Sequence, residues 1–257
     1  VYAYILQQYN QVLRQRNALL KRDAVRSGDR PDTHSPNLSD QEIFAAEISE
    51  VPPNPADQDV LALWDAQLAA TGTRVMRRRA RVVQRLAPLA THWHQEISGR
   101  KEDLEIRYLA NAPIATDDPE AIRLAFLEKI RERSIAEHFQ GTTLVGPHRD
   151  EVEFTINQSS ARQYGSQGQQ RTLVLALKLA ELKLIEDVIG DPPLLLLDDV
   201  LAELDLNRQN QLLEAIQDRY QTLITTTHLG AFDAQWLKSS QVFSVKAGQL
   251  LAGDREA

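Results

Sequence analysis

The chain has 257 residues, of which 42% are hydrophobic and 25% charged, with a formal net charge of −7 and no cysteine. The lack of cysteine excludes a disulfide framework, a cysteine-ligated metal centre and a cysteine nucleophile, and it fits a reducing, cytoplasmic compartment. No apolar run approaches the roughly 20 residues that a membrane-spanning helix needs, so we expect no membrane partner. The acidic balance argues against a basic coat over the whole surface, but a net figure does not exclude a local basic patch.

The first 23 residues predict an amphipathic helix, because their apolar side chains recur with a period of 3.6. These side chains are Tyr2, Ile5, Leu6, Tyr9, Val12, Leu13, Leu19 and Leu20. The helical pattern is already under way at Val1, and the only methionine is Met76. We therefore expect the chain to be the C-terminal part of a longer protein.

Residues 31–60 change character: they hold five prolines and seven acidic residues but no lysine or arginine. Such a composition cannot bury much apolar surface, so we interpret it as a mobile acidic insertion, at about residues 24–59, rather than a domain. A short helix around 40–48 remains open. By contrast, residues 1–30 carry six basic side chains against two acidic ones.

A second helix is expected from about 60 to 97. Its apolar side consists of Leu61, Trp64, Leu68, Val75, Val82, Leu86 and Leu89, and its other side is basic, with Arg74, Arg77, Arg78, Arg79, Arg81 and Arg85. Two helices joined by a flexible insertion indicate an antiparallel helical arm. A third helix begins at Asp118-Pro119, an N-cap followed by proline at the first helical position, and runs to about Phe139.

From residue 142 the pattern becomes α/β. Val152–Ile156 alternates as a half-buried strand, and a helix follows over about 169–189. The apolar run Leu194–Leu197 is typical of a parallel strand covered on both faces. A helix over about 206–218 then leads to a strand at 222–226, which completes a right-handed βαβ unit, and residues 242–251 predict a closing hairpin.

The strongest chemical signal is Asp198-Asp199, directly after the apolar run. Carboxylates at the C-terminal edge of a parallel sheet lie where α/β proteins bind ligands, and they suit Mg²⁺ shared with phosphate oxygens. One of them could orient the metal's water shell while the other polarises an attacking water. The alternative is that Asp198 caps a turn and Asp199 is solvated.

Three further segments carry weaker signals. In Tyr164–Arg171, two glycines precede or open a long helix, whose free N–H groups and Ser166 hydroxyl suit a phosphate, although a capped turn explains them equally. Thr225–His228 follows a strand and places an imidazole at the same sheet edge, or the histidine is structural. Gly146–Asp150 presents His148 and Arg149 on a rigid turn, which could bind an anion or form an ion pair with Asp150.

In this order and spacing, these segments resemble the C-terminal half of an ABC-type ATPase head, and in particular the RecF family of SMC-like ATPases of DNA replication and repair. Ser166-Gln167-Gly168-Gln169 is similar to the signature motif, Leu194–Asp199 to Walker B, and Ala202–Asp205 to the D-loop. His228 is similar to the switch histidine. Sequence motifs particular to the RecF family resemble three segments of this chain: Gly146–Asp150, Ser166–Thr172 and the helical stretch 9–21. The acidic insertion alone falls outside the resemblance.

The resemblance implies a role for each residue. Asp198 would hold Mg²⁺ through water, Asp199 would take the place of a catalytic glutamate and suggest slow hydrolysis, and His228 would sense the γ-phosphate. Ser166, Gln167, Gly168 and Gln169 would contact ATP held by the other protomer, and Asp205 would lie at the dimer seam. The implied cofactors are ATP and Mg²⁺. The implied partners are a second copy in an ATP-dependent homodimer, gapped or damaged DNA with single-stranded/double-stranded junctions, and recombination mediator proteins.

The expected fold class is α/β: the C-terminal half of an ABC/SMC-type P-loop ATPase head with an inserted helical arm (lid). Residues 1–140 would form the arm and 141–257 the Walker B and signature half. A P-loop needs a Gly-Lys pair to cradle phosphates, and no Gly-Lys dipeptide occurs in the chain. We therefore expect the chain alone to bind ATP negligibly, to lack ATPase activity and, with its first strands missing, to expose apolar surface that lowers stability or favours self-association.

The basic side of the arm predicts a phosphate-backbone contact through Arg74, Arg77, Arg78, Arg81 and Arg85 that is largely independent of sequence, or it is an ordinary solvated helix face. Two other functions stay open. The chain could be a non-catalytic ABC-like module that binds DNA or partner proteins. It could also be a metal-dependent nuclease of the topoisomerase–primase type, although adjacent carboxylates on an extended strand diverge, which disfavours that chemistry.

Overall fold

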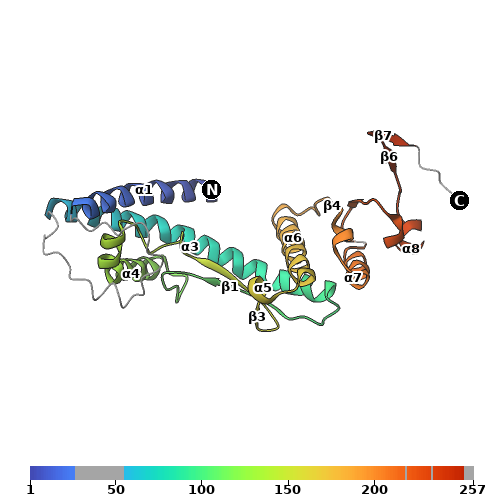
Figure 1. The fold of residues 1–257 in the computed structure, drawn as a ribbon, viewed down its shortest axis with the longest axis horizontal. Helices are drawn as coiled ribbons and strands as arrows, with labels where there is room; N and C mark the ends of the chain where they lie inside the picture. Colours follow the sequence, from blue (N-terminus) through green and yellow to red (C-terminus); the bar gives the residue numbers. More distant parts are fainter. Residues whose placement is uncertain (27–54, 218, 233, 252–257) are drawn as a thin grey trace. The chain divides into compact units, whose positions relative to one another are not determined.

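The structure is a computed structural model that describes residues 1–26, 55–217, 219–232 and 234–251 (Figure 1). The predicted short helix around 40–48 lies outside these residues. The described chain forms two compact units, one built from residues 1–84 and 107–153 and the other from 85–106 and 154–257. The functional division at residue 140 stays a prediction. Among the described residues, no helix combines the length and apolar character needed to cross a membrane.

Two antiparallel helices form the frame of the first unit. These are α1 (Tyr2–Arg26) and α3 (Pro55–Ile97), the second of which continues into the other unit. Their side-chain contacts run in opposite directions along the chain: Tyr2 meets Arg79, Gln8 meets Arg74 and Arg16 meets Asp65. The predicted helical pair is therefore confirmed, with longer helices than the periodicity indicated.

A third helix, α4 (Pro119–Gln140), packs on this pair. Both of its ends are capped as the sequence predicts: the Asp118 carboxylate accepts hydrogen bonds from the backbone of Glu120 and Ala121, and Gly141 ends the helix in the left-handed conformation. The three helices share one apolar core, to which α1 contributes Tyr9, α3 contributes Leu68 and α4 contributes Phe126. The Val82 side chain, expected on the buried side of α3, is exposed instead.

A buried ion network fixes the register of this core. Arg16 is almost fully buried, and its guanidinium donates to Asp65 at 2.6 Å, to Glu137 at 2.7 Å and to Thr143 at 2.9 Å. Burial raises the pKa of Glu137, an effect that the neighbouring Arg16 charge opposes. Removal of either partner would leave a desolvated charge, so this network specifies how α1, α3 and α4 meet.

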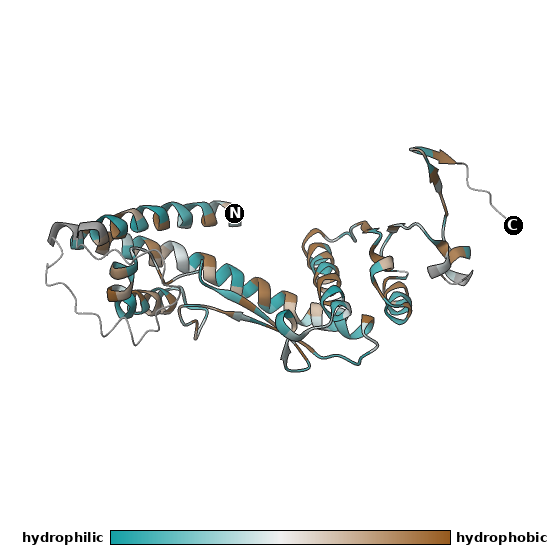
Figure 2. Cartoon of the chain, in the orientation of Figure 1, coloured by the Kyte–Doolittle hydropathy of each residue, from teal (hydrophilic) through white to brown (hydrophobic). Residues whose placement is uncertain are grey.

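The second unit contains a parallel strand pair. Strand β4 (Leu195–Asp198) pairs in register with β5 (Thr222–Thr225), and the crossover between them contains the 3₁₀ turn η1 (Val200–Glu203) and helix α7 (Leu206–Ile216). This confirms the predicted βαβ unit. The long helix α6 (Gln167–Ile189) precedes it, and hydrophobic residues occur on several faces of α6 (Figure 2).

Smaller elements complete the described chain. Strands β1 (Leu104–Leu109), β2 (Glu151–Ile156) and β3 (Ser159–Ser160) form a sheet in that order, followed by the short helix α5 (Ala161–Tyr164). Helix α8 (Ala234–Lys238) precedes the hairpin of β6 (Ser244–Lys246) and β7 (Gln249–Leu251), which the sequence predicted. Strand β1 and helix α8 were not anticipated.

Candidate functional site

The paired acids lie at the C-terminal end of β4, beside the end of β5. Asp198 is in register with Thr225, whose hydroxyl donates a hydrogen bond to the Asp198 carboxylate. The next residue, Asp199, donates its backbone N–H to the Thr225 carbonyl at 3.2 Å and adopts a left-handed backbone with φ 52°. A left-handed conformation is uncommon for a residue other than glycine, and it ends the strand at this point. Both acidic side chains are exposed at one sheet edge.

His228 follows β5 by three residues, and the end of β5 is in register with Asp198 at the end of β4. The His228 Nδ1 lies 2.7 Å from the Thr227 hydroxyl, and its backbone N–H donates to the Thr226 hydroxyl at 3.2 Å. His228 is exposed, and within the described residues its hydrogen bonds are to the neighbouring Thr226 and Thr227. That the His228 ring and the two acids form one site stays a prediction.

The glycine-containing segment forms a capped helix start. Ser166 is the N-cap of α6: its hydroxyl accepts from the Gln169 N–H at 3.2 Å, and the Gln169 side chain accepts from the Ser166 N–H at 2.9 Å. This capping box satisfies two backbone donors internally. Gln167 is exposed and Gly168 half-exposed in the first turn, so both remain accessible to a ligand.

The segment after the acids turns back onto the start of α6. Asp205 caps α7 by accepting from the Arg208 N–H at 3.1 Å, and its side chain remains exposed. Arg171 donates to the Glu203 carbonyl at 2.7 Å. The first turns of α6, two residues beyond the predicted signature segment, therefore contact the predicted D-loop directly.

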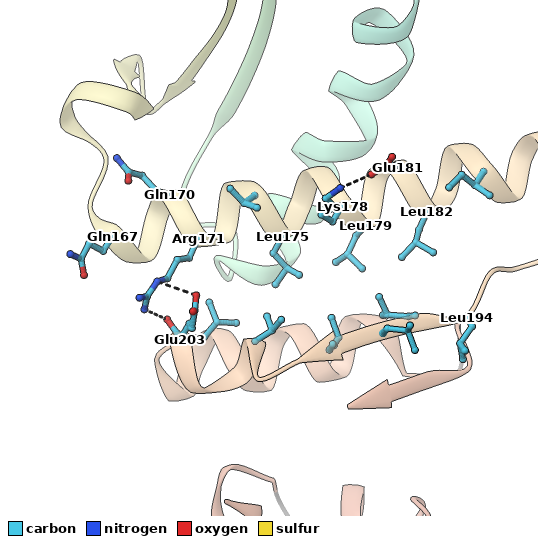
Figure 3. Close-up of a pocket in the computed structure, with 17 residues that line it drawn as sticks. Gln167, Gln170, Arg171, Leu175, Lys178, Leu179, Glu181, Leu182, Leu194 and Glu203 are labelled. Atoms are coloured by element: carbon cyan, nitrogen blue, oxygen red, sulfur yellow. Dashed lines mark hydrogen bonds and ion pairs between the residues drawn. The ribbon is translucent and has the colours of Figure 1, made fainter. Parts of the chain in front are cut away.

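An apolar groove of about 810 Å³ lies between α6 and β4. Leu175, Leu179 and Leu182 of α6 point toward β4, and the ion pair of Arg171 with Glu203 closes one end (Figure 3). The solvent-exposed side chains that line this groove include Leu196, 62% exposed, and Val174, 59% exposed. Exposed apolar surface of this kind is a feature of interaction surfaces, and it agrees with the expected uncovered surface of the head.

The residues at the strand edge fit a magnesium ion that is shared with a phosphate. Among the described residues, no group of three or more His, Asp or Glu side chains could by itself hold a metal ion. Mg²⁺ does not require such a cage, because it keeps several waters and binds through one or two carboxylates together with substrate phosphates. The exposed Asp198 carboxylate, beside the Thr225 hydroxyl, supplies oxygen ligands of this type.

The Gly146–Asp150 turn is a structural junction in the first unit. His148 Nδ1 lies 2.6 Å from the Tyr9 hydroxyl, and its Nε2 lies 3.1 Å from the Thr143 carbonyl. Asp150 accepts from Tyr108 and from the Asn111 N–H, while Arg149 remains exposed. The sequence left open an anion site or an ion pair of Arg149 with Asp150, and in the structure Asp150 pairs with Arg79 at 4.0 Å.

The five arginines predicted to bind DNA differ in their surroundings. Arg77 and Arg81 both bind the Asp117 carboxylate, with Nε to oxygen distances of 3.0 Å each. Arg74 donates to the Gln8 side chain at 3.5 Å. Arg78 and Arg85 are exposed and make no hydrogen bond or ion pair that the described residues provide. The role of this stripe, like the roles of the acids, His228 and the capped segment, stays a prediction.

Known proteins resemble this chain along almost its whole length. The DNA replication and repair protein RecF of Cyanothece sp. is 65% identical over 247 residues, which cover 96% of this chain and 58% of that protein. RecF of Nostoc punctiforme is 64% identical, over 98% of this chain and 60% of its own length. The chain therefore spans about three fifths of these relatives.

Solved structures agree. The structure of the recombination mediator protein RecF-ATPrS in the RecFOR pathway superimposes with a TM-score of 0.67 at 30% identity, over 97% of this chain and 58% of that one. The corresponding RecF-ATP structure gives a TM-score of 0.65. No family model matches the chain. The resemblance to RecF that the motifs indicated is confirmed, and so is a mixed α/β fold shared with part of RecF.

Proposed function

We propose that this chain contributes the arm and the signature and Walker B portions of an ATP-dependent DNA-binding clamp. The chain is a homologue of RecF that corresponds to about three fifths of the RecF sequence. Such a clamp acts at gapped or damaged DNA in recombinational repair. Its fold is then the C-terminal half of an ABC/SMC-type ATPase head with an inserted arm. The proposal extends the RecF relationship to activity, substrate and partners.

The observation that carries the proposal is the shared edge of β4 and β5. The register of Asp198 with Thr225 supports the proposal, because Asp199 directly follows one of these parallel strands and His228 follows the other by three residues. Parallel sheets bind ligands outside the carboxyl ends of their strands. The solved relatives of this fold include RecF-ATP and RecF-ATPrS.

In the proposed mechanism, each residue has one task. Asp198 would hold Mg²⁺ through a water molecule, and the ion would supply positive charge that stabilises the phosphates. Asp199 orients and polarises the attacking water, with a shorter reach than a glutamate, which favours slow hydrolysis. The exposed His228 ring donates a hydrogen bond to the γ-phosphate, so it responds to the loss of that group.

The capped start of α6 serves the second protomer. Its backbone N–H groups and Ser166 hydroxyl suit a phosphate, because a helix N-terminus carries unsatisfied donors and positive partial charge. Ser166–Gln169 would contact ATP that the partner's P-loop holds, with Asp205 at the seam between the heads. ATP then joins two copies, and hydrolysis releases them. The P-loop would come from sequence beyond this chain, because no Gly-Lys pair occurs within it.

The test compares this chain with the full-length gene product. Calorimetry should detect no micromolar Mg-ATP affinity for the chain alone and clear affinity for the full-length product. ATP should convert the full-length product to a dimer on gapped duplex DNA, and Asp199→Asn should slow hydrolysis by about 100-fold while the dimer persists. Micromolar ATP binding by the chain alone, or a full-length product that does not dimerise with ATP, contradicts the proposal.

A non-catalytic binding module is the second candidate, favoured by one observation. Asp199 would stand where a catalytic glutamate is expected, and its side chain is shorter. Its left-handed backbone conformation sets the direction in which this short side chain leaves the chain. If the full-length product binds ATP and DNA but shows no turnover above the Asp199→Asn variant, this second function is correct. The nuclease alternative predicts Mg²⁺-dependent nicking of supercoiled DNA, which we do not expect.

A further inference from the structure

Arg208, near the start of α7, lies where three segments of the second unit meet. Its guanidinium donates to the Gly168 carbonyl at 3.2 Å and to the Thr172 hydroxyl, both in the first turns of α6. It also binds the Glu102 carboxylate, with an Nη2 to Oε1 distance of 2.7 Å, and lies 3.2 Å from the Asp205 carboxylate. One cation therefore joins the capped helix start, the D-loop segment and Glu102, which lies two residues before β1.

The central pair of this cluster is largely removed from solvent. The side chain of Glu102 is 10% exposed and that of Arg208 17% exposed. Two charges held at low exposure interact more strongly than a surface pair, and loss of one leaves the other desolvated. The pair thus determines the local geometry more firmly than the exposed ion pairs of α6 do.

Glu102 has a second neighbour at the end of α3. The His94 Nε2 lies 3.5 Å from its carboxylate, and the His94 ring is fully buried. Neither ring nitrogen of His94 has a hydrogen-bond partner among the residues that the structure describes. A buried polar group without a partner is rare, and Glu102 is a carboxylate that this imidazole approaches. Glu102 therefore lies between the end of α3 and the start of α6.

We propose that Arg208 is a positioning residue that couples Ser166–Gln169 to the C-terminal end of α3 through Glu102. Helix α3 is the element that carries the basic stripe, so the pair links the proposed nucleotide-facing segment to the proposed DNA-binding helix. This inference rests on the proposed function for the meaning of Ser166–Gln169, but the coupling itself is a property of this chain.

The coupling is tested first without nucleotide. In the full-length gene product, Arg208→Met should speed amide hydrogen exchange of residues 166–172 by about tenfold, because two anchors of that turn are lost. Glu102→Gln should do the same to a smaller extent, and the double variant should exchange no faster than Arg208→Met alone, since both remove one link. Lys178→Met is the control, because Lys178 lies on α6 but pairs only with exposed Glu181.

The functional arm then separates positioning from general stability. Arg208→Met should leave ATP affinity of the monomer unchanged and reduce ATP-dependent dimerisation and kcat by about tenfold or more, with partial rescue by Arg208→Lys. If Arg208→Met does not fold, the Arg208→Met/Glu102→Gln variant, which leaves no unpaired carboxylate, replaces it. Unchanged exchange at 166–172, or strictly additive effects of the two substitutions, overturns the coupling. Absence of ATP binding by the wild type overturns the proposed function instead, while the exchange result still decides the coupling.

Discussion

Two glycines around the α6 cap have different structural demands. A Cβ at Gly165 would lie 2.4 Å from the Ala161 carbonyl oxygen, a backbone atom that cannot move aside. A Cβ at Gly168 would meet only the Arg208 side chain, at 3.9 Å. The first glycine is therefore needed for the fold of the turn, whereas the second is free for alanine in the folded chain.

This difference gives a matched pair of substitutions. Gly165→Ala should lower the free energy of unfolding by about 2 kcal/mol, because the turn must open. Gly168→Ala should leave it within about 0.5 kcal/mol, since alanine fits a helical first turn. If Gly168 contacts ATP across the dimer, its substitution should still reduce ATP-dependent dimerisation of the full-length gene product at least tenfold. Denaturant unfolding and sedimentation measure the two effects, and normal dimerisation of Gly168→Ala would remove this residue from the proposed site.

His148 gives the first unit a pH dependence of defined sign. Although part of the residue is exposed, its ring lies between Tyr9 and the Thr143 carbonyl, and desolvation lowers its pKa. The unfolded chain therefore binds a proton at higher pH than the folded one. The associated stability is fully present above the unfolded pKa of about 6.5 and is lost as the pH falls through the lower, folded value.

The corresponding experiment measures Tm between pH 8 and pH 5.5. The wild type should melt at progressively lower temperature below about pH 6.5. His148→Gln, which can still accept from Tyr9 and donate to Thr143, should show a shallower decline. His94, whose pKa burial also lowers, remains in both proteins, so the difference between them isolates His148. Identical slopes would assign the pH dependence to other groups.

At the scale of single elements, the features that the sequence predicted are those with a local cause. The start of α4 follows from Asp118-Pro119, the start of α6 from a serine three residues before a glutamine, and β4 from its apolar run. Strand β1 was missed although Leu104, Ile106 and Tyr108 alternate with polar residues, because its partner β2 lies more than 40 residues away. The contacts of Arg208 and Asp117 could not be predicted either, since they join residues far apart in the chain.

In the predicted site, too, features with a local cause could be predicted from the sequence, whereas contacts between residues far apart in the chain could not. The order of motifs placed Asp198, Asp199 and His228 at one edge because the ends of parallel strands meet there. Periodicity alone treated all arginines of α3 as one basic face, whereas the structure separates them by their partners. Arg79 is an example: it donates to the Tyr2 hydroxyl at 3.0 Å and to the Pro147 carbonyl, so it supports the fold of the first unit.

Helix α3 carries its cationic stripe over the 12 residues from Arg74 to Arg85, about 16 Å of helix, which is long enough to meet several phosphates. The Asp117 carboxylate forms ion pairs with Arg77 and Arg81, near the middle of the stripe. Hydrogen bonds from Arg81 and Arg77 hold the pKa of Asp117 below its usual range, so it stays ionised at neutral pH. If the stripe binds DNA, this carboxylate would compete with a phosphate for Arg77 and Arg81.

Asp117→Asn should therefore strengthen DNA binding of the full-length gene product about threefold at 0.1 M salt and steepen its salt dependence, because more counterions are released. The double variant Arg78→Glu/Arg85→Glu should weaken DNA binding.

The control is Arg131→Glu, which changes an exposed arginine of α4 outside the stripe. Fluorescence anisotropy with duplex and gapped DNA over a salt series measures both parameters. If Asp117→Asn and Arg131→Glu leave affinity equally unchanged, the stripe is a solvated helix face.

At the scale of the whole molecule, the groove between α6 and β4 marks where the described part of the fold is apolar but uncovered. The chain spans about three fifths of its RecF relatives, so their additional sequence is a natural candidate to cover this surface. Full burial of a leucine side chain stabilises a protein by about 2 kcal/mol, which makes such a covering strongly favourable. Without it, two copies of the chain can cover each other instead.

The two forms of the protein should therefore respond in opposite ways to one substitution. In the chain alone, Leu196→Ser should reduce self-association at micromolar concentration and barely alter Tm, because Leu196 is 62% exposed there. In the full-length gene product it should lower the free energy of unfolding by about 2–4 kcal/mol, since the same side chain is then buried. Val188→Ser, a change of similar chemistry at a 73% exposed residue that does not line the groove, should do neither. Sedimentation velocity and denaturant unfolding of both forms decide the matter: an equal cost of Leu196→Ser in both would mean that the groove stays open in the complete protein.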